Sequence, residues 1–266
     1  MQLTLISGCL SLMFFLWVIP PAAGVQAEQQ VETQSEQNLP VREEINRTFQ
    51  FARFARVDVS GLAGGPVNIE TIDGNTVEVR LLRSAQTQAE LDCYRIIVEY
   101  TPDSLTIRHE QNTGSRVCRS IRAAQSLLLR VPRAVDISLK TIGGAVNVGA
   151  IDGALRISGI AGHVTAAGVR EAEMDGLAKG LTMSITQPGE RGIRVSGIVG
   201  AVELDLAQHL NADLTVSNLI GIDDKTPGVT VTNVNAASGR TRFGSGGPPI
   251  SISGVVGSVR INHRTK

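Results

Sequence analysis

Hydrophobic and polar residues alternate along much of the chain, most clearly between Thr141 and Ala166. Apolar residues at every second position place their side chains on one face of a β-strand. In this region each of three alternating runs follows a glycine, the runs being Val146/Val148, Leu155/Ile157 and Val164/Ala166. The pattern therefore predicts a short strand, a corner and another short strand, repeated along the chain.

The glycines Gly144, Gly153 and Gly162 are spaced nine residues apart. Glycine suits a tight corner, because it adopts positive φ without a Cβ penalty. A motif of Ser-Gly, an aliphatic residue, any residue and Gly recurs elsewhere, and it predicts further corners at Gly200 and Gly257. A unit of this kind cannot bury its apolar face alone, so we expect the units to stack on one another.

The strand pattern predicts an all-β fold. Strand-like runs of about five residues recur through the chain after residue 48, and helical periodicity is close to absent. Two architectures fit this pattern, a single-domain β-solenoid-like stack and a large β-sandwich. A sandwich does not need a repeated corner motif, so the sequence favours the solenoid. Residues 133–262 carry the regular repeats, and residues 48–132 form a less regular N-terminal β cap.

The N-terminal part predicts export. Residues 3–20 are apolar and uncharged, and a small-x-small pattern ending at Ala27 follows them, so we expect a signal peptide of residues 1–27 cleaved before Glu28. The alternative is an uncleaved anchor helix, since the run barely reaches the length of a membrane span. Residues 28–47 are polar, lack apolar periodicity and are predicted to form a flexible tether.

Composition and cysteine usage limit which partners and which cellular compartment are expected. The chain has 25 Lys+Arg and 25 Asp+Glu, which leaves no basic excess to attract nucleic acid. Aromatic residues make up only 3%, so the core is predicted to be aliphatic. Removing the signal leaves Cys93 and Cys118, and two cysteines in an exported domain are expected to form a disulfide. No Cys-x-x-Cys or Cys/His spacing favours the alternative of metal-binding thiols.

The sequence patterns of common catalytic sites are missing. There is no G-x-S-x-G motif and no P-loop. We therefore expect no catalytic residue, no metal site and no cofactor. Three sets of residues are candidates for chemistry. They are four dispersed histidines (His109, His163, His209, His263), four carboxylates (Asp205, Asp213, Asp223, Asp224, the last two also as calcium ligands) and a basic cluster (Arg116, Arg119, Arg122). The basic cluster is either an anion or glycan contact or a solvated loop.

Several stretches together resemble a known family. They are the strand pair at 57–79, the strand ending in Val-Pro at Pro132, the Gly-headed repeats, and the segment GSGGPPISISGVVGSVRI at 244–261. Over about residues 48–262 the chain resembles the bacterial DUF4097 family of β-strand repeat proteins, which overlaps the adhesin-like, head-GIN-type domains. The resemblance implies an exported, right-handed β-solenoid without established enzyme activity, and some members are linked to envelope-stress sensing or surface attachment. The chain departs from the family in its Ser-Gly corners and its cysteine pair.

Together these features predict an exported, non-catalytic protein, either adhesin-like or a scaffold or binding module of the bacterial cell envelope. It would act in the periplasm, at the cell surface or after release. The expected partner is a protein or a cell-wall polysaccharide, with no nucleic acid and no membrane span after signal cleavage. Exposed sheet edges also permit a homodimer. Two alternatives stay open: an envelope-stress or signalling accessory protein, and a polysaccharide-active solenoid enzyme with several carboxylates on one strand face.

Overall fold

The structure is a computed structural model that describes residues 39–263, except 53–54, 112–117, 119–122 and 221–237. The described residues belong to one compact unit. Nearly all of its elements are strands: β1 (Val41–Gln50), β2 (Arg56–Ser60), β3 (Val67–Ile72), β4 (Thr76–Ala85), the helix α2 (Gln88–Cys93), β5 (Tyr94–Thr101), β6 (Ser104–Gln111), β7 (Ala123–Pro132), β8 (Asp136–Ile142), β9 (Val146–Val148), β10 (Ala154–Ile160), β11 (Val164–Ala166), β12 (Glu171–Leu177), β13 (Gly180–Ile185), β14 (Ile193–Val199), β15 (Ala201–Leu206), β16 (Ala212–Ile220), β17 (Ser238–Phe243), β18 (Pro249–Val256) and β19 (Val259–His263).

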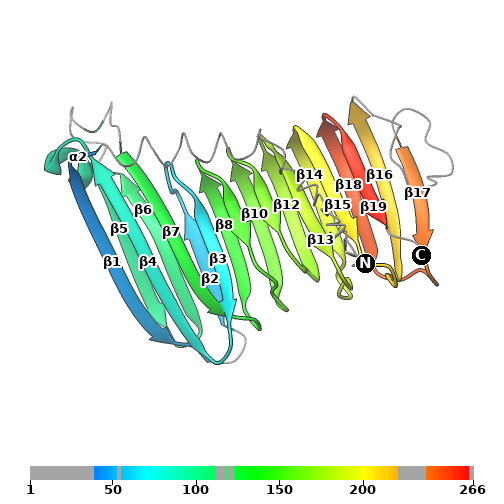
Figure 1. Cartoon of the computed structure of the whole chain (residues 1–266), viewed down its shortest axis with the longest axis horizontal. Coiled ribbons are helices and arrows are strands. Elements are labelled where there is room, and N and C mark those ends of the chain that lie inside the picture. Colours follow the sequence, from blue (N-terminus) through cyan, green and yellow to red (C-terminus); the bar gives the residue numbers. More distant parts are fainter. Residues whose placement is uncertain (1–38, 53–54, 112–117, 119–122, 221–237, 264–266) are drawn as a thin grey trace, which may run out of the picture. The chain divides into compact units, whose positions relative to one another are not determined.

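The strands form two sheets that run the length of the unit (Figure 1). Sheet A has the order β1-β4-β7-β3-β9-β11-β13-β15-β19, and sheet B has the order β17-β16-β18-β14-β12-β10-β8-β2-β6-β5. From β8 to β15 the chain alternates between the sheets, so one strand of each makes one coil. Neighbouring coils pair in parallel, and Val146, Val164, Leu181, Val202 and Val259 align across sheet A. The all-β fold and the stacking of short strands are confirmed.

The nine-residue repeat corresponds to half a coil. Gly144 and Gly162 occupy the same corner of successive coils, and Gly153 lies at the opposite corner beside Val135. One full coil is therefore two repeats long, with one repeat contributing to each sheet.

The core lies between the sheets and is aliphatic, as the composition predicts. Leu155 and Ile157 of β10 and Val164 of β11 are at most 2% exposed, and similar side chains fill each coil. Burying one such side chain contributes roughly 1.5–3 kcal/mol. Because each coil presents the same apolar face to the next, the stack is stabilised by neighbour contacts along its whole length.

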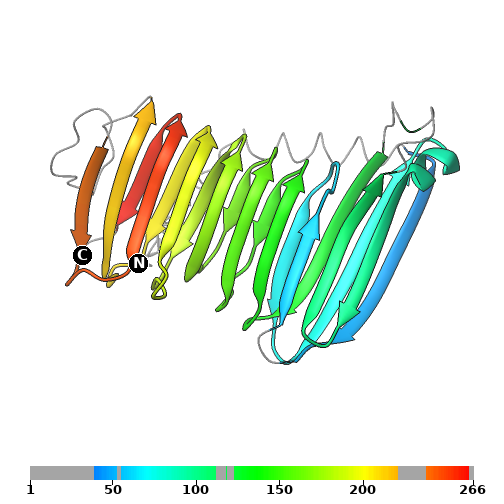
Figure 2. The same ribbon diagram turned by 180° about the vertical axis from the view of Figure 1, so that it is seen from behind.

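Antiparallel strands end both sheets at the N-terminal side and sheet B at the other side, where sheet A ends in the parallel strand β19 (Figure 2). At the N-terminal end β5 pairs antiparallel with β6, and β4 pairs antiparallel with both β1 and β7. At the other end β17 pairs antiparallel with β16. Strand β18 lies between β14 and β16, although it follows both in sequence. The less regular N-terminal part is thus a cap of antiparallel pairs, of which β5–β6 is a hairpin.

Strand β1 corrects one expectation from the sequence. Residues 28–47 were predicted to form a flexible tether, but β1 begins at Val41 and pairs with β4 over ten residues. The pattern was hidden because only Val41, Ile45 and Phe49 are apolar on the inner side, while Glu43 between them is charged. Glu43 is accommodated there because it forms an ion pair with Arg83 of β4.

Candidate functional site

Three carboxylates lie on the outer face of β12 at alternate positions, namely Glu171, Glu173 and Asp175. The residues between them, Ala172 and Met174, point inward and are buried, because side chains alternate between the two faces of a strand. The inner face of β12 therefore belongs to the core, and its outer face is an acidic row in the middle of sheet B.

Polar residues from the neighbouring strands flank this row. Beside β12, β14 and the turn before it supply partners at short range: Arg191 to Glu171 at 3.5 Å, Arg194 to Glu173 at 3.9 Å, and Ser196, whose hydroxyl donates to Asp175 at 2.8 Å. On the other side, β10 places Arg156 level with Glu173 and Ser158 level with Asp175. We call these eight residues the β12 polar face.

The strands of the β12 polar face are in register, and the ion pair at its centre is exposed to solvent. The side chains of Arg194 and Glu173 are 71% and 61% exposed. Exposed ion pairs of this kind contribute about 0–1 kcal/mol, so their partners can be exchanged at little cost. Neighbouring strands lie about 4.8 Å apart, and alternate residues of one strand about 6.6 Å apart. Donors and acceptors thus form a lattice suited to an extended polar polymer.

The outer face of sheet A carries polar contacts of its own. The amide of Asn147 donates to Asn68 at 2.8 Å, which links β9 to β3. Near the other end, the Asn262 amide donates to Glu203 at 3.2 Å and to Asp205 at 2.8 Å. These contacts join neighbouring coils, so these surface side chains also stabilise the stack.

A shallow depression of about 280 Å³ lies on sheet A at the N-terminal cap, lined by Asn46, Arg47, Thr48, Glu78, Val79, Arg80, Leu128 and Arg130. Arg80 pairs with Glu44 at 2.8 Å, and Arg130 pairs with Glu70 at 2.9 Å and Glu78 at 3.3 Å. Hydrogen bonds to Glu70 and Glu78 raise the pKa of Arg130, and a hydrogen bond from Asn46 with the charge of Arg80 lowers the pKa of Glu44. The charges are balanced locally, so the depression does not select an anion.

A buried polar cluster lies between the sheets at the same end. Arg83 pairs with Glu43 and donates to the carbonyl oxygens of Leu91, at 3.4 Å, and Tyr94. Gln125, directly opposite Arg83 on β7, is 2% exposed, and its amide has no hydrogen-bond partner in the described part of the chain. Such a group is expensive to bury.

His109 adjoins this cluster from β6. Its ring stacks on Tyr94 with the ring centroids 4.6 Å apart. Burial, together with the positive charge of Arg83, lowers the pKa of His109 from its ordinary value of 6.5. The imidazole is therefore favoured in its neutral form in the folded chain.

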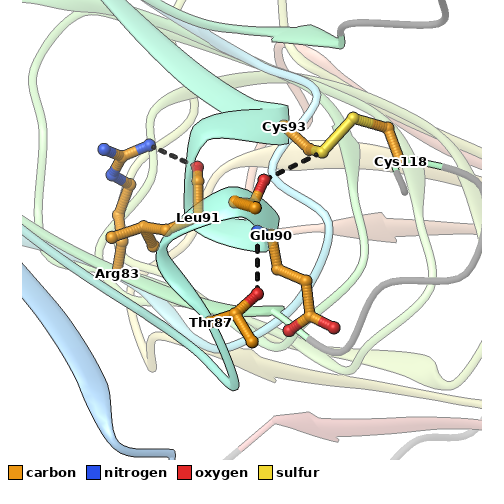
Figure 3. Close-up of a disulfide and its surroundings, with 7 residues drawn as sticks. Arg83, Thr87, Glu90, Leu91, Cys93 and Cys118 are labelled. Carbon is orange, nitrogen blue, oxygen red and sulfur yellow. Dashed lines mark hydrogen bonds between the residues drawn. A yellow bond between two sulfur atoms is a disulfide. The ribbon is translucent and has the colours of Figure 1, made fainter. Parts of the chain in front are cut away.

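The predicted disulfide between Cys93 and Cys118 is present (Figure 3). The two Cα atoms lie 5.4 Å apart, and the bridge attaches the end of α2 to the segment after β6. Thr87 caps α2, since its hydroxyl oxygen accepts a hydrogen bond from the Glu90 amide at 3.2 Å. The same short helix offers the Leu91 carbonyl to Arg83, so the disulfide and the buried cluster share one element.

The five corner glycines all lie in turns between strands. Gly200 and Gly257 adopt positive φ, at 113° and 146°. Gly144, Gly153 and Gly162 do not adopt positive φ, so the conformational reason that the sequence suggested for these three glycines is wrong. A Cβ on Gly144 would instead overlap the carbonyl oxygen of Gly65 in the neighbouring coil, and the same clash recurs at Gly153 and Gly162. These three glycines are required by close stacking.

The structure does not bring together the two sequence-predicted carboxylates that it describes, Asp205 and Asp213. Asp205 lies on sheet A, whereas Asp213 lies on sheet B and pairs with Arg242 at 2.9 Å, an interaction that lowers the pKa of Asp213. The other candidates lie outside the described residues: Ala27, Glu28, Asp223, Asp224, Arg116, Arg119 and Arg122. Sequence reasoning missed Glu171, Glu173 and Asp175, although the Glu-x-Glu-x-Asp alternation marks a strand with one acidic face.

The described residues hold neither a metal-binding cluster nor a membrane-spanning helix. No group of three or more His, Cys, Asp or Glu side chains among them could hold a metal ion. None of the helices within the described ranges is long and apolar enough to cross a membrane.

Comparison with known proteins gives distant structural similarity. No family model and no curated protein sequence matches the chain. Among solved structures, a proposed cell adhesion protein of Clostridium sporogenes is 10% identical with a TM-score of 0.40, covering 84% of this chain and 100% of its own. A proposed adhesin of Bacteroides fragilis is 12% identical with a TM-score of 0.35 (84% and 98%), and a proposed lipid-binding protein of Parabacteroides distasonis is 14% identical with a TM-score of 0.26 (84% and 97%). These similarities do not place the chain in a family.

Proposed function

We propose that this chain is an exported binding or scaffold protein of the bacterial cell envelope, and that its β12 polar face contacts an extended polar polymer such as a cell-wall polysaccharide. The observation that carries the proposal is the lattice of exposed donors and acceptors on that face. Arg194, Glu173 and Arg156 come from three successive strands and lie side by side in register. Membership of the DUF4097 family is part of the same proposal.

Three further features support it. Exposed pairs such as Glu173 with Arg194 contribute little to stability, so a ligand hydroxyl or amide can replace one partner without unfolding the site. The Cys93–Cys118 disulfide fits an oxidising compartment outside the cytoplasm. The rigid stack holds the face in one geometry, which reduces the entropy lost on binding.

Co-sedimentation with insoluble peptidoglycan, and with a panel of immobilised surface polysaccharides, tests the proposal on the purified exported chain. The double variant Glu173→Gln/Arg194→Gln should reduce binding by about tenfold or more, since it removes both charges at the centre of the face. The matched control is Glu203→Gln/Arg260→Gln, which removes an exposed pair of the same kind (3.8 Å) from the outer face of sheet A. Equal binding by both variants would contradict the proposed site.

A second candidate function is cleavage of a polysaccharide. Glu173 and Asp175 lie two residues apart on one strand face, so their Cα atoms are about 6.6 Å apart. Carboxyl pairs of glycosidases are separated by about 5–9.5 Å, which this spacing permits. New reducing ends that appear with wild type and vanish with Asp175→Asn would establish this function. Binding without new reducing ends would favour the scaffold function. The absence of both binding and new reducing ends would favour a protein as the partner.

A further inference from the structure

Strand β1 is a long, open sheet edge at the N-terminal end of the stack. It pairs over ten residues with β4, and sheet A has no strand beyond it in the described part of the chain. In Figures 1 and 2 it is the outermost strand of that end. An edge of this length presents a row of backbone N–H and C=O groups that can pair with another strand.

The inner side of β1 is incompletely covered. Val41, Ile45 and Phe49 are half-buried, and the last two pack partly against the core. Glu43 lies between them and accepts from Arg83 through its Oε2 atom. Arg47 is exposed and has no ion pair among the described residues. The edge therefore has apolar side chains that are still partly exposed and an arginine without an ion pair among the described residues.

We propose that β1 pairs antiparallel with β1 of a second copy of this chain, about a two-fold axis that passes beside Ile45. In this register Glu43 of each copy faces Arg47 of the other, and Val41 faces Phe49. The Ile45 side chains face each other. A carboxylate can accept several hydrogen bonds, so Glu43 keeps Arg83 and still accepts from Arg47 of the second copy through Oε1.

Charge complementarity selects this register over its neighbours. A two-fold axis beside Glu44 would place two glutamates opposite each other, and an axis beside Arg47 would do the same with two arginines. Like charges directly opposite each other destabilise a strand pair. On the outer side of the Ile45 register, Arg42 faces Thr48 and Glu44 faces Asn46, so no repulsion arises there.

The other sheet edges, β19, β17 and β5, fit a second copy less well. Strand β19 has only five residues. Strand β17 carries only positive charges, Arg240 and Arg242, so pairing with itself would bring cations together. Strand β5 also carries a complementary pair, Arg95 and Glu99, but it spans eight residues against the ten of β1. The β1 edge thus combines half-buried apolar residues, an unmatched arginine and a self-complementary order of charges.

The interface is small, so the dimer should be reversible. Ten residues from each copy are fewer than the roughly 20–30 per side of a standard stable interface. We expect dimer formation to rise with protein concentration. It should weaken as salt screens the two symmetric Glu43–Arg47 pairs.

Sedimentation velocity over a concentration series of the purified exported chain tests the dimer. Arg47→Glu should weaken it about tenfold or more, because each glutamate at 43 then faces another carboxylate. The control Arg240→Glu makes the same charge change on the edge strand at the opposite end and should leave the dimer intact. A chain that stays monomeric up to its solubility limit overturns the proposal, as does an Arg47→Glu variant that dimerises like wild type.

Cysteine cross-linking tests the register independently. Residues directly opposite each other in an antiparallel pair have Cα atoms about 4.5–5.5 Å apart, which a disulfide can bridge. Ile45→Cys should therefore give a covalent dimer on a non-reducing gel. Asn46→Cys should not, because its nearest copy lies diagonally at about 7–8 Å. A covalent dimer from Ile97→Cys, at the centre of β5, without one from Ile45→Cys would overturn the proposal. Melting curves of each variant establish that it is folded.

Discussion

At the residue scale, the side-chain amide of Gln125 is buried without a hydrogen-bond partner in the described part of the chain, which should destabilise the fold. Neither its nitrogen nor its oxygen has a hydrogen-bond partner within the described ranges, although the side chain is 2% exposed. Desolvating an amide without a compensating hydrogen bond costs about 1–3 kcal/mol by protein mutational data. The neighbouring Arg83 pairs with Glu43 and two carbonyl oxygens and leaves only its Nε without a partner among the described residues, whereas both polar atoms of the Gln125 amide lack one.

Replacing Gln125 with leucine should therefore stabilise the chain. The change keeps a similar volume and removes the unpaired amide, and we expect the free energy of unfolding to rise by about 1–2 kcal/mol. Chemical denaturation of wild type and variant measures the difference. Gln50→Leu is the control, because Gln50 is exposed and donates to Thr76 at 3.2 Å, so no gain is expected there. A loss of stability in Gln125→Leu would mean that the amide is hydrogen-bonded in solution.

His109 should make stability depend on pH. Its folded-state pKa is lowered from 6.5, by burial and by the charge of Arg83, while its unfolded pKa stays near the ordinary value. Below that value the unfolded chain binds the proton more readily, so stability falls as the pH decreases through 6.5 and further toward the folded pKa. Urea midpoints across this range should decline less in His109→Gln than in wild type. His209→Gln, an exposed histidine, should reproduce the wild-type slope.

At the element scale, the Ser-Gly motif has a conformational cause. The glycine of each copy adopts left-handed φ at Gly61, Gly159, Gly197 and Gly254, and Gly176, which follows Asp175, does the same at the equivalent position, with values of 62–74°. In β8 the same position is held by Thr141, with a φ of 55°. Among the described residues, Thr141 is the one residue other than glycine that has a positive φ. A β-branched residue is strained in this conformation.

Thr141→Gly should relieve that strain. The left-handed region costs an L-residue about 1–2 kcal/mol, and glycine loses about 0.5–1 kcal/mol to the greater freedom of its unfolded state. The net result should be a gain of up to about 1 kcal/mol, read as a higher melting temperature. The reciprocal change Gly159→Ala places a side chain at the equivalent corner and should lower it. Destabilisation by Thr141→Gly would show that the threonine side chain makes compensating contacts.

The same elements show what the sequence could predict. The short strands and their corners could be read from local alternation and from glycine spacing, because both are set by residues close in sequence. Strand β1 could not, since the partner that accommodates Glu43 is Arg83, forty positions away. The insertion of β18 between β14 and β16 likewise depends on pairing between distant segments. On β12 the alternation of acidic residues could be predicted from the sequence, but the pairing of these residues with Arg194 and Ser196 could not.

At the scale of the whole molecule, a solenoid is held together by contacts between neighbouring coils. Loss of one contact should therefore loosen its own end of the stack more than the far end. The Cys93–Cys118 bridge tests this idea, because it lies in the N-terminal cap and closes a loop with a sequence separation of 25. In the chain-entropy model a loop of this size contributes roughly 3 kcal/mol.

The variant Cys93→Ser/Cys118→Ser should lose about that amount, and the loss should be local. Hydrogen exchange followed by mass spectrometry should show faster exchange in β4 and β5, which contact α2, and in β6, which pairs with β5, and unchanged protection in β10 to β15. Wild type with the disulfide intact is the reference, and Thr87→Ala, which removes the cap of α2 alone, separates loss of the helix from loss of the bridge. Equal deprotection of β4 and β15 would instead show that the two ends unfold as one cooperative unit. In that case the antiparallel cap, and not the parallel coils, would set the stability of the entire stack.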